Sequence, residues 1–103
     1  MGNYNWKDGR KYYGLFKDND MHGYGVYYYP DGVVYKGCFY EDKKDGYGHY
    51  YWTDGRVYDG WWLKGKQHGL GSYFDPFKKK AKKGIWENGK RLMWFTTEQV
   101  RII

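Results

Sequence analysis

Residues 23–37 read GYGVYYYPDGVVYKG, and residues 46–60 read GYGHYYWTDGRVYDG, with every glycine in the same place. The two copies start 23 residues apart (46 − 23 = 23). A fixed period of this length indicates a repeat protein, in which each unit is one small motif stacked on its neighbours. Tyr and Gly fill positions where most small domains carry Val, Leu and Ile, so aromatic rings must supply the core.

The period continues along the chain. Tyr-x-Gly begins at residues 12, 35 and 58, Gly-x-Gly at 23, 46 and 69, and Asp-Gly at 8, 31 and 54. Each unit contains two alternating, aromatic-rich runs separated by turn residues, which is typical of β-hairpins. In the Asp-Gly pairs the glycine supplies a positive φ. Glycines inside the runs predict bulges or close backbone approach, with a large ring lying across each small glycine surface.

The composition supports one small all-β domain. The chain has 103 residues, of which 14 Tyr, 6 Trp and 5 Phe make 25 aromatics (14 + 6 + 5 = 25), and its net charge is +6. Each aromatic side chain can bury roughly 150–250 Å². The positive charge favours acidic partners. A single cysteine, Cys38, and no evident signal peptide predict a cytoplasmic setting.

The unit Y-x-G-x-[FW]-x(6)-G-x-G-x-Y resembles the MORN (membrane occupation and recognition nexus) repeat, over about residues 3–95. The resemblance implies an elongated, twisted antiparallel sheet of stacked β-hairpins, a single layer with an aromatic and glycine core. At about 4.8 Å per strand, the array is a rod roughly 40 Å long.

We predict one array over residues 1–95, with a half-repeat at 3–11, repeats starting near 12, 35 and 58, and a degenerate one near 82. Residues 96–103 do not match the repeat and are expected to form a C-terminal tail that covers the last edge strand or docks on a neighbour. The two end segments, around Tyr4–Trp6 and Leu92–Phe95, are candidate edge strands for pairing with a partner.

Alternation of side chains separates two faces. The motif positions, such as Tyr12 and Gly14, form the core face. The opposite face also carries large apolar residues that the repeat does not demand, and these residues, which we call the aromatic face, are predicted to bind a protein partner: Tyr13, Tyr24, Tyr28, Tyr47, Tyr51, Trp61, Leu70 and Phe74. The alternative is that a thin sheet needs packing on both sides.

The repeat breaks at residues 75–84, DPFKKKAKKG. This lysine cluster is predicted to be a solvated loop between the third and fourth hairpins, or else a site for an anionic partner such as phospholipid headgroups; it comprises Lys78, Lys79, Lys80, Lys82 and Lys83. Nucleic-acid binding is not expected, because the basic run is local and no nucleic-acid motif accompanies it.

The sequence offers no catalytic constellation. His22 and His68 occupy the same repeat position two units apart, which is roughly 20 Å in this architecture, so they cannot share a metal ion. We therefore expect no enzyme activity, no cofactor and no metal. The resemblance implies a protein-interaction scaffold in a larger cytoskeletal or ciliary assembly, and the alternative is a peripheral membrane adaptor that binds anionic phospholipids through the lysine cluster.

Overall fold

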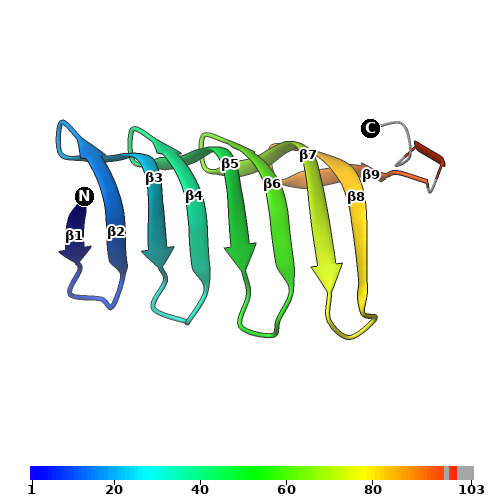
Figure 1. Ribbon diagram of the computed structural model, residues 1–103, viewed down its shortest axis with the longest axis horizontal. Coiled ribbons are helices and arrows are strands. Elements are labelled where there is room, and N and C mark those ends of the chain that lie inside the picture. The colour runs from blue at the N-terminus through cyan, green and yellow to red at the C-terminus, as the bar shows by residue number, and fades with distance from the viewer. Residues whose placement is uncertain (97, 100–103) are drawn as a thin grey trace.

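The computed structural model describes residues 1–96, 98 and 99. It contains one antiparallel sheet in which the strands follow one another in chain order (Figure 1). The strands are β1 (Gly2–Asn5), β2 (Lys11–Lys17), β3 (Asp20–Tyr28), β4 (Val34–Tyr40), β5 (Lys43–Tyr51), β6 (Val57–Leu63), β7 (Lys66–Asp75), β8 (Lys80–Glu87) and β9 (Lys90–Trp94). The molecule measures 45 × 27 × 20 Å. The predicted elongated sheet of stacked hairpins is confirmed.

Turn chemistry explains where the chain reverses. Asp18 and Asn19, between β2 and β3, have φ values of 52° and 71°, as in the type I′ turns whose twist matches that of the flanking strands. The Asp-Gly returns between hairpins place glycine at φ values of 103°, 98° and 97° in Gly9, Gly32 and Gly55. The predicted positive φ at these glycines is confirmed.

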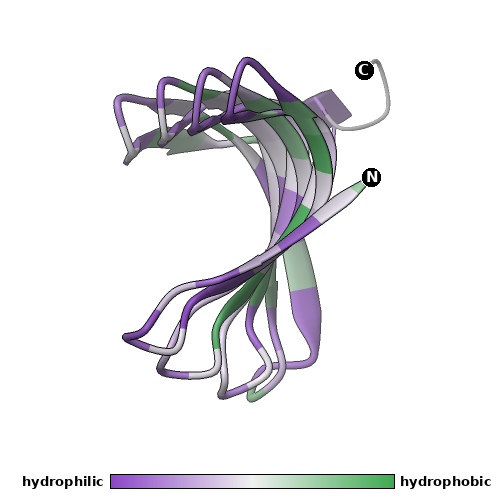
Figure 2. Ribbon diagram, turned by 90° about the vertical axis from the view of Figure 1, so that its left-hand side faces the viewer, coloured by the Kyte–Doolittle hydropathy of each residue, from purple (hydrophilic) through white to green (hydrophobic). Residues whose placement is uncertain are grey.

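The glycines inside the strands form one row across the sheet. Cross-strand pairing joins Gly2, Gly14, Gly25, Gly37, Gly48, Gly60, Gly71 and Gly84. The strand register shifts just after the glycine in β2, β4 and β6, and such bulges bend a strand. Seen along the stack, the strands curve into a C, so the sheet has a concave and a convex face (Figure 2).

A buried tyrosine lies across the glycine row in each complete repeat. Tyr35 has no exposed surface, and a Cβ added to Gly48 would lie 2.5 Å from its ring carbons. Its hydroxyl donates to the Cys38 carbonyl at 2.8 Å, inside the bulge. Tyr12 and Tyr58 repeat this arrangement. The predicted interlocking of rings and glycines is confirmed.

These tyrosines are part of a continuous row of rings, which we call the floor row. Neighbouring rings meet edge to face, with centroids 4.9–5.6 Å apart, in the order Phe16, Tyr12, Phe39, Tyr35, Trp62, Tyr58, Trp86 and Trp94. Such pairs contribute about 0.5–1.5 kcal/mol each beyond the area they bury. A sheet with a single layer thus gains a core by curling around its own rings.

The strands β1 and β9 are the two edges of the sheet, where the sequence placed the candidate edge segments. Beyond β9, the Thr96 amide donates to Gln99 Oε1 at 2.7 Å. The remaining tail positions, 97 and 100–103, lie outside the described residues, so the tail as an edge cap, and the division of the chain at residue 95, stay predictions.

Candidate functional site

A second row of rings runs beside the floor row on the same face of the sheet. We call it the wall row. Its neighbouring centroids are 4.8–6.1 Å apart, and its members are Trp6, Tyr27, Tyr29, Tyr50, Trp52, Tyr73 and Trp94. Most of these rings are half-buried rather than fully covered, so they remain accessible from the concave side.

Three cavities follow the wall row, one for each step between hairpins. Their volumes are about 400, 280 and 190 Å³. Trp6 and Tyr29 line the first, Tyr50 and Trp52 the second, and Trp52 and Trp94 the third. We call this succession of cavities the groove. The repeat therefore produces a groove whose cavities recur once per hairpin.

One position of the repeat lines the groove with a different residue in each hairpin. It lies opposite the floor-row ring of the preceding strand and is occupied in turn by Met21, Lys44, Gln67 and Arg91. The residue opposite is always aromatic. This position, in contrast, is apolar in the first hairpin, cationic in the second and fourth, and an amide in the third. A position that packing does not restrict can be used for selecting a ligand.

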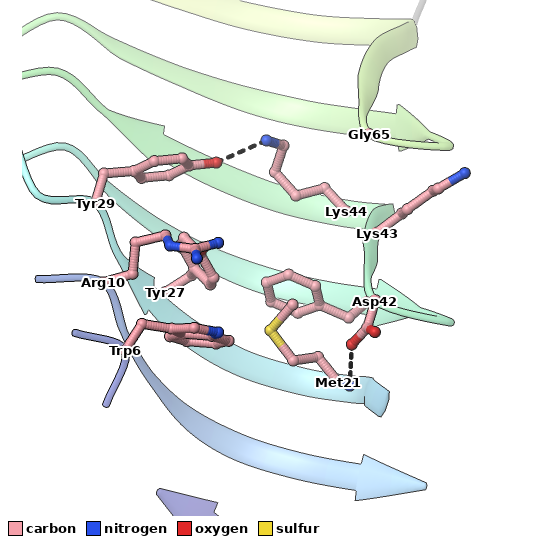
Figure 3. A pocket seen from close by; sticks show the side chains of 10 residues that line it. Trp6, Arg10, Met21, Tyr27, Tyr29, Asp42, Lys43, Lys44 and Gly65 are labelled. Carbon is pink, nitrogen blue, oxygen red and sulfur yellow. Dashed lines mark hydrogen bonds between the residues drawn. The ribbon is translucent and has the colours of Figure 1, made fainter. Parts of the chain in front are cut away.

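Lys44 is the most unusual of these residues (Figure 3). Its ammonium donates to the Tyr29 hydroxyl at 2.8 Å and lies 5.1–5.9 Å from the ring centres of Tyr29, Tyr35, Tyr50 and Trp62. Burial lowers the pKa of Lys44, because removal from water disfavours the charged form. None of the ion pairs in the described part of the chain includes Lys44, and its ammonium lies among four aromatic rings.

Two arginines support the wall row from the outer turns. Arg10 lies over the Trp6 ring at 4.9 Å, and its NH1 approaches the Tyr27 hydroxyl at 3.4 Å. Arg10 Nε donates one hydrogen bond that is shared between the two carboxylate oxygens of Asp8, and this hydrogen bonding lowers the pKa of Asp8. The same arrangement recurs two repeats later in Arg56, Trp52, Tyr73 and Asp54. These arginines are already paired, whereas Lys44 is not.

The predicted aromatic face lies on the opposite, convex side of the sheet. Cross-strand pairing joins Tyr47 to Trp61, whose rings are 5.3 Å apart. Seven of its eight members have 37–51% of their surface exposed, namely Tyr13, Tyr24, Tyr28, Tyr47, Trp61, Leu70 and Phe74. Tyr51 is half-buried, with the Lys36 ammonium 5.6 Å from its ring centre. The role of this face in binding stays a prediction.

The lysine cluster is not one loop. Only the first two of its lysines lie in the turn after β7, and β8 begins at Lys80. Within the strand, Lys82 approaches the Trp94 ring to 5.6 Å on the core side, whereas Lys83 lines a cavity with Tyr47 and Trp61 of the aromatic face. The expectation of a loop was wrong from Lys80 onward, because residues 80–87 pair in register with β7 and β9. Side-chain alternation then sends neighbouring lysines to opposite faces.

The sequence analysis missed the groove, although a signal was present. Trp6, Tyr29 and Trp52 stand 23 residues apart, and none of them belongs to the motif. The motif positions of the core face were interpreted as packing, and the candidate contact sites were the aromatic face, the lysine cluster and the two edge segments. A face that curls over itself buries its central rings and leaves the outer ones half open, and this curvature does not follow from alternation alone.

The described residues hold no cluster of three or more His, Cys, Asp or Glu side chains arranged to bind a metal. No helix in that part of the chain has the length and apolarity needed to cross a bilayer. What the site does offer is binding chemistry, with ring faces, hydroxyls and cations along a groove.

Comparison with known protein families gives one match. A family model described as the MORN repeat matches residues 12–34, 35–55 and 58–76, which together make 63 of the 103 residues (23 + 21 + 19 = 63). A sequence comparison with curated proteins finds no match. The matched segments coincide with the three hairpins that carry Tyr12, Tyr35 and Tyr58.

Proposed function

Because the chain belongs to the MORN repeat family, we propose that it is a non-enzymatic scaffold that holds a segment of a partner protein in its groove. MORN repeats are non-catalytic interaction repeats, generally associated with protein–protein or membrane–lipid interactions. Participation in a cytoskeletal or ciliary assembly, in the cytoplasm, is part of the same proposal.

The observation that carries the proposal is the unpaired Lys44 charge inside the groove. Lys44 is half-buried, and a charge that is partly removed from water lowers stability unless a partner compensates for it. Cation–π contacts with four rings offset part of that cost, and an acidic group from a ligand would offset more. The fold itself does not require a cation here, because the same repeat position holds Met21 in the preceding hairpin.

The aromatic face is a second candidate contact. Its exposed rings form an apolar surface with Asp59 and Lys83 beside them, and large exposed apolar patches commonly mark protein interfaces. A partner that wraps around the edge of the sheet would use both faces. A partner held by a single segment needs only the groove.

The alternative is binding to an anionic membrane surface through the lysine cluster. Each lysine near such a surface contributes about 1 kcal/mol at low salt. The division of the lysines between the turn and two faces of β8 weakens this alternative, because a flat membrane contacts one face at a time.

The proposal is tested by affinity capture from native extract with a matched pair of tryptophan variants. Trp52→Ala removes a ring shared by two groove cavities, and Trp61→Ala removes a half-exposed ring of the aromatic face. We expect the partner to be lost with Trp52→Ala and retained with Trp61→Ala, while far-ultraviolet circular dichroism shows both variants to be folded.

Loss of the partner with Trp61→Ala and retention with Trp52→Ala would instead indicate that the partner binds the aromatic face. In parallel, sedimentation with liposomes that contain phosphoinositides tests the membrane alternative. Lipid binding that is lost on charge reversal at Lys79, Lys80 and Lys82, together with no captured protein, would replace the scaffold by a membrane adaptor.

A further inference from the structure

The groove has a period set by the sheet. Strands in a sheet lie about 4.7–4.9 Å apart, and each repeat adds two strands, so equivalent groove positions recur about every 9.4–9.8 Å. The three cavities recur once per repeat, since their linings include the equivalent residues Met21, Lys44 and Gln67 in turn. A segment that fills successive cavities with equivalent groups must have nearly the same period.

Only one regular backbone conformation matches this period closely. Polyproline II has three residues per turn and rises about 3.1 Å per residue, which gives about 9.3 Å per turn. Seven residues of an α-helix advance about 10.5 Å, so a helix drifts out of register by roughly 1 Å per repeat, about three times as fast. A β-strand presents one face every two residues, about 6.6 Å, and is out of phase from the second cavity onward.

The lining of the groove also suits polyproline II. This helix has no internal hydrogen bonds, so its carbonyl oxygens need donors from the protein. The Tyr27 hydroxyl accepts from Arg10 and the Tyr73 hydroxyl accepts from Arg56, so each hydroxyl still has its own proton to donate. Grooves lined by aromatic residues are the known mode of recognition for such segments.

Two cations in the groove, Lys44 and Arg91, would set the register of a bound segment. Within the described residues, neither Lys44 nor Arg91 forms an ion pair. Lys44 is on β5 and Arg91 on β9, four strands apart, which is about 19 Å at the usual spacing. Six residues of polyproline II span about 18.6 Å. A ligand with two acidic residues six positions apart would therefore reach both cations.

We propose that the groove binds a proline-rich segment in the polyproline II conformation, which carries two acidic residues six positions apart, opposite Lys44 and Arg91. The inference rests on the proposed function and names the ligand class for the same groove. About twelve residues, roughly 37 Å in this conformation, span its length.

The test is selection of a displayed library of random dodecapeptides on the wild-type protein, followed by binding of selected peptides to variants. We expect enriched peptides with prolines at three-residue intervals and Asp or Glu six positions apart. A synthetic copy of such a peptide should bind at least tenfold more weakly to Lys44→Met and to Trp52→Ala, and equally well to Trp61→Ala. Moving one acidic residue so that the interval is four should also lower the affinity about tenfold.

The possible failures are distinguishable. Enriched peptides that lack the proline pattern but lose binding with Trp52→Ala would overturn this ligand class and leave groove binding intact. Peptides that lose binding with Trp61→Ala and not with Trp52→Ala would contradict groove binding itself. A selection that enriches nothing would overturn the polyproline II ligand class, since the library contains such peptides. Capture from extract would then decide separately whether the groove binds a partner. If Trp52→Ala fails to fold, Lys44→Met alone decides, because Met is native at the same position in the first hairpin.

Discussion

The second and fourth hairpins solve the same packing problem in different ways. In the second, β4–β5, the Tyr35 ring is fully buried across Gly48. In the fourth, β8–β9, Lys82 occupies the place of that tyrosine, two residues before Gly84. Trp94 pairs opposite Gly84 and brings its own ring to 3.1 Å from where a Cβ on that glycine would lie. A ring thus covers the glycine row in both hairpins, supplied by the first strand in one and by the second strand in the other.

The difference shows which contacts the interior of the stack requires. The ring of Tyr35 is packed between Phe39 and Trp62, which come from two different hairpins. The last hairpin has no further hairpin to contact, so it tolerates a lysine whose charge approaches Trp94 at the edge. The tyrosine is therefore an inter-repeat element, and we expect its importance to fall from the interior to the end of the stack.

The largest expected effect is the difference in the free energy of unfolding between a substitution of Tyr35 and a substitution of Lys82. Tyr35→Ala removes a fully buried ring and leaves a cavity between two hairpins, which should lower the free energy of unfolding by about 3–5 kcal/mol. Lys82→Ala removes an exposed side chain and should change it by less than about 0.5 kcal/mol. Urea denaturation of both variants measures the difference, and equal losses would contradict the contrast between the hairpins.

Alkaline pH should act through the same tyrosines. Burial raises the pKa values of Tyr12, Tyr35 and Tyr58 above the ordinary value of 10. The unfolded chain then releases these protons first, so stability is fully present below about pH 10 and falls as pH rises above it, by up to about 1.4 kcal/mol per pH unit for each tyrosine.

For Tyr35 and Tyr58, whose pKa values are raised the most of the three, the loss between pH 10 and pH 11 is about 1 kcal/mol each, because an unfolded tyrosine is already half ionised at pH 10. Thermal unfolding monitored across this range, with the tyrosinate absorbance recorded in parallel, measures it. Tyr35→Phe should make the slope shallower, and an unchanged slope would show that Tyr35 ionises equally in the folded and unfolded chain.

The interlock of ring and glycine predicts a smaller effect. Gly48→Ala places a Cβ against the Tyr35 ring, and overpacking of this kind costs about 1–3 kcal/mol. Combined with Tyr35→Ala, the same change should cost much less, because the ring that it meets has gone. A double-mutant cycle measures this coupling, and additive costs would mean that the ring does not restrict position 48.

The smallest effect concerns the cation that distinguishes the second hairpin from the first. Lys44→Met copies Met21 and removes a half-buried charge that no described ion pair includes, so we expect the free energy of unfolding to rise by about 1 kcal/mol at pH 7. The folded-state pKa of Lys44 lies below its ordinary value. The cost of the wild-type lysine is therefore complete at low pH and decreases as pH rises toward the unfolded-state pKa.

The advantage of Lys44→Met should accordingly be larger at pH 7 than at pH 9.5 in matched urea titrations. Destabilisation at pH 7 would mean that the four rings more than compensate for burial of the ammonium, and that Lys44 contributes to stability without a ligand.

Much of this architecture could be predicted from residues alone. Recurrence of Gly14, Gly37 and Gly60 beside Tyr12, Tyr35 and Tyr58 predicted the hairpins, the glycine contacts and the bulges, because each depends on local spacing. The route by which the fourth hairpin replaces its tyrosine could not be predicted. It depends on Trp94 of β9 pairing opposite Gly84 of β8. This pairing accompanies a register shift between Ile85 and Trp86.

The groove is the other feature that sequence reasoning did not reach. Two-residue alternation separates the core face from the aromatic face, but it treats each face as flat. The curvature that turns the core face into a channel results from bulges repeated in three hairpins. Tyr29 directly follows β3 and Lys44 lies on β5, so the two come from either side of β4 and meet only after the sheet has bent.

The most direct test of the groove as the binding site is photo-crosslinking from two positions in native extract. A photoreactive phenylalanine analogue replaces either Tyr29, which lines the groove, or Tyr24, which is half-exposed on the aromatic face. The account predicts that a partner crosslinks from position 29 and not from position 24, and that Lys44→Met abolishes the adduct. The same adduct from position 24 alone, unaffected by Lys44→Met, would contradict it.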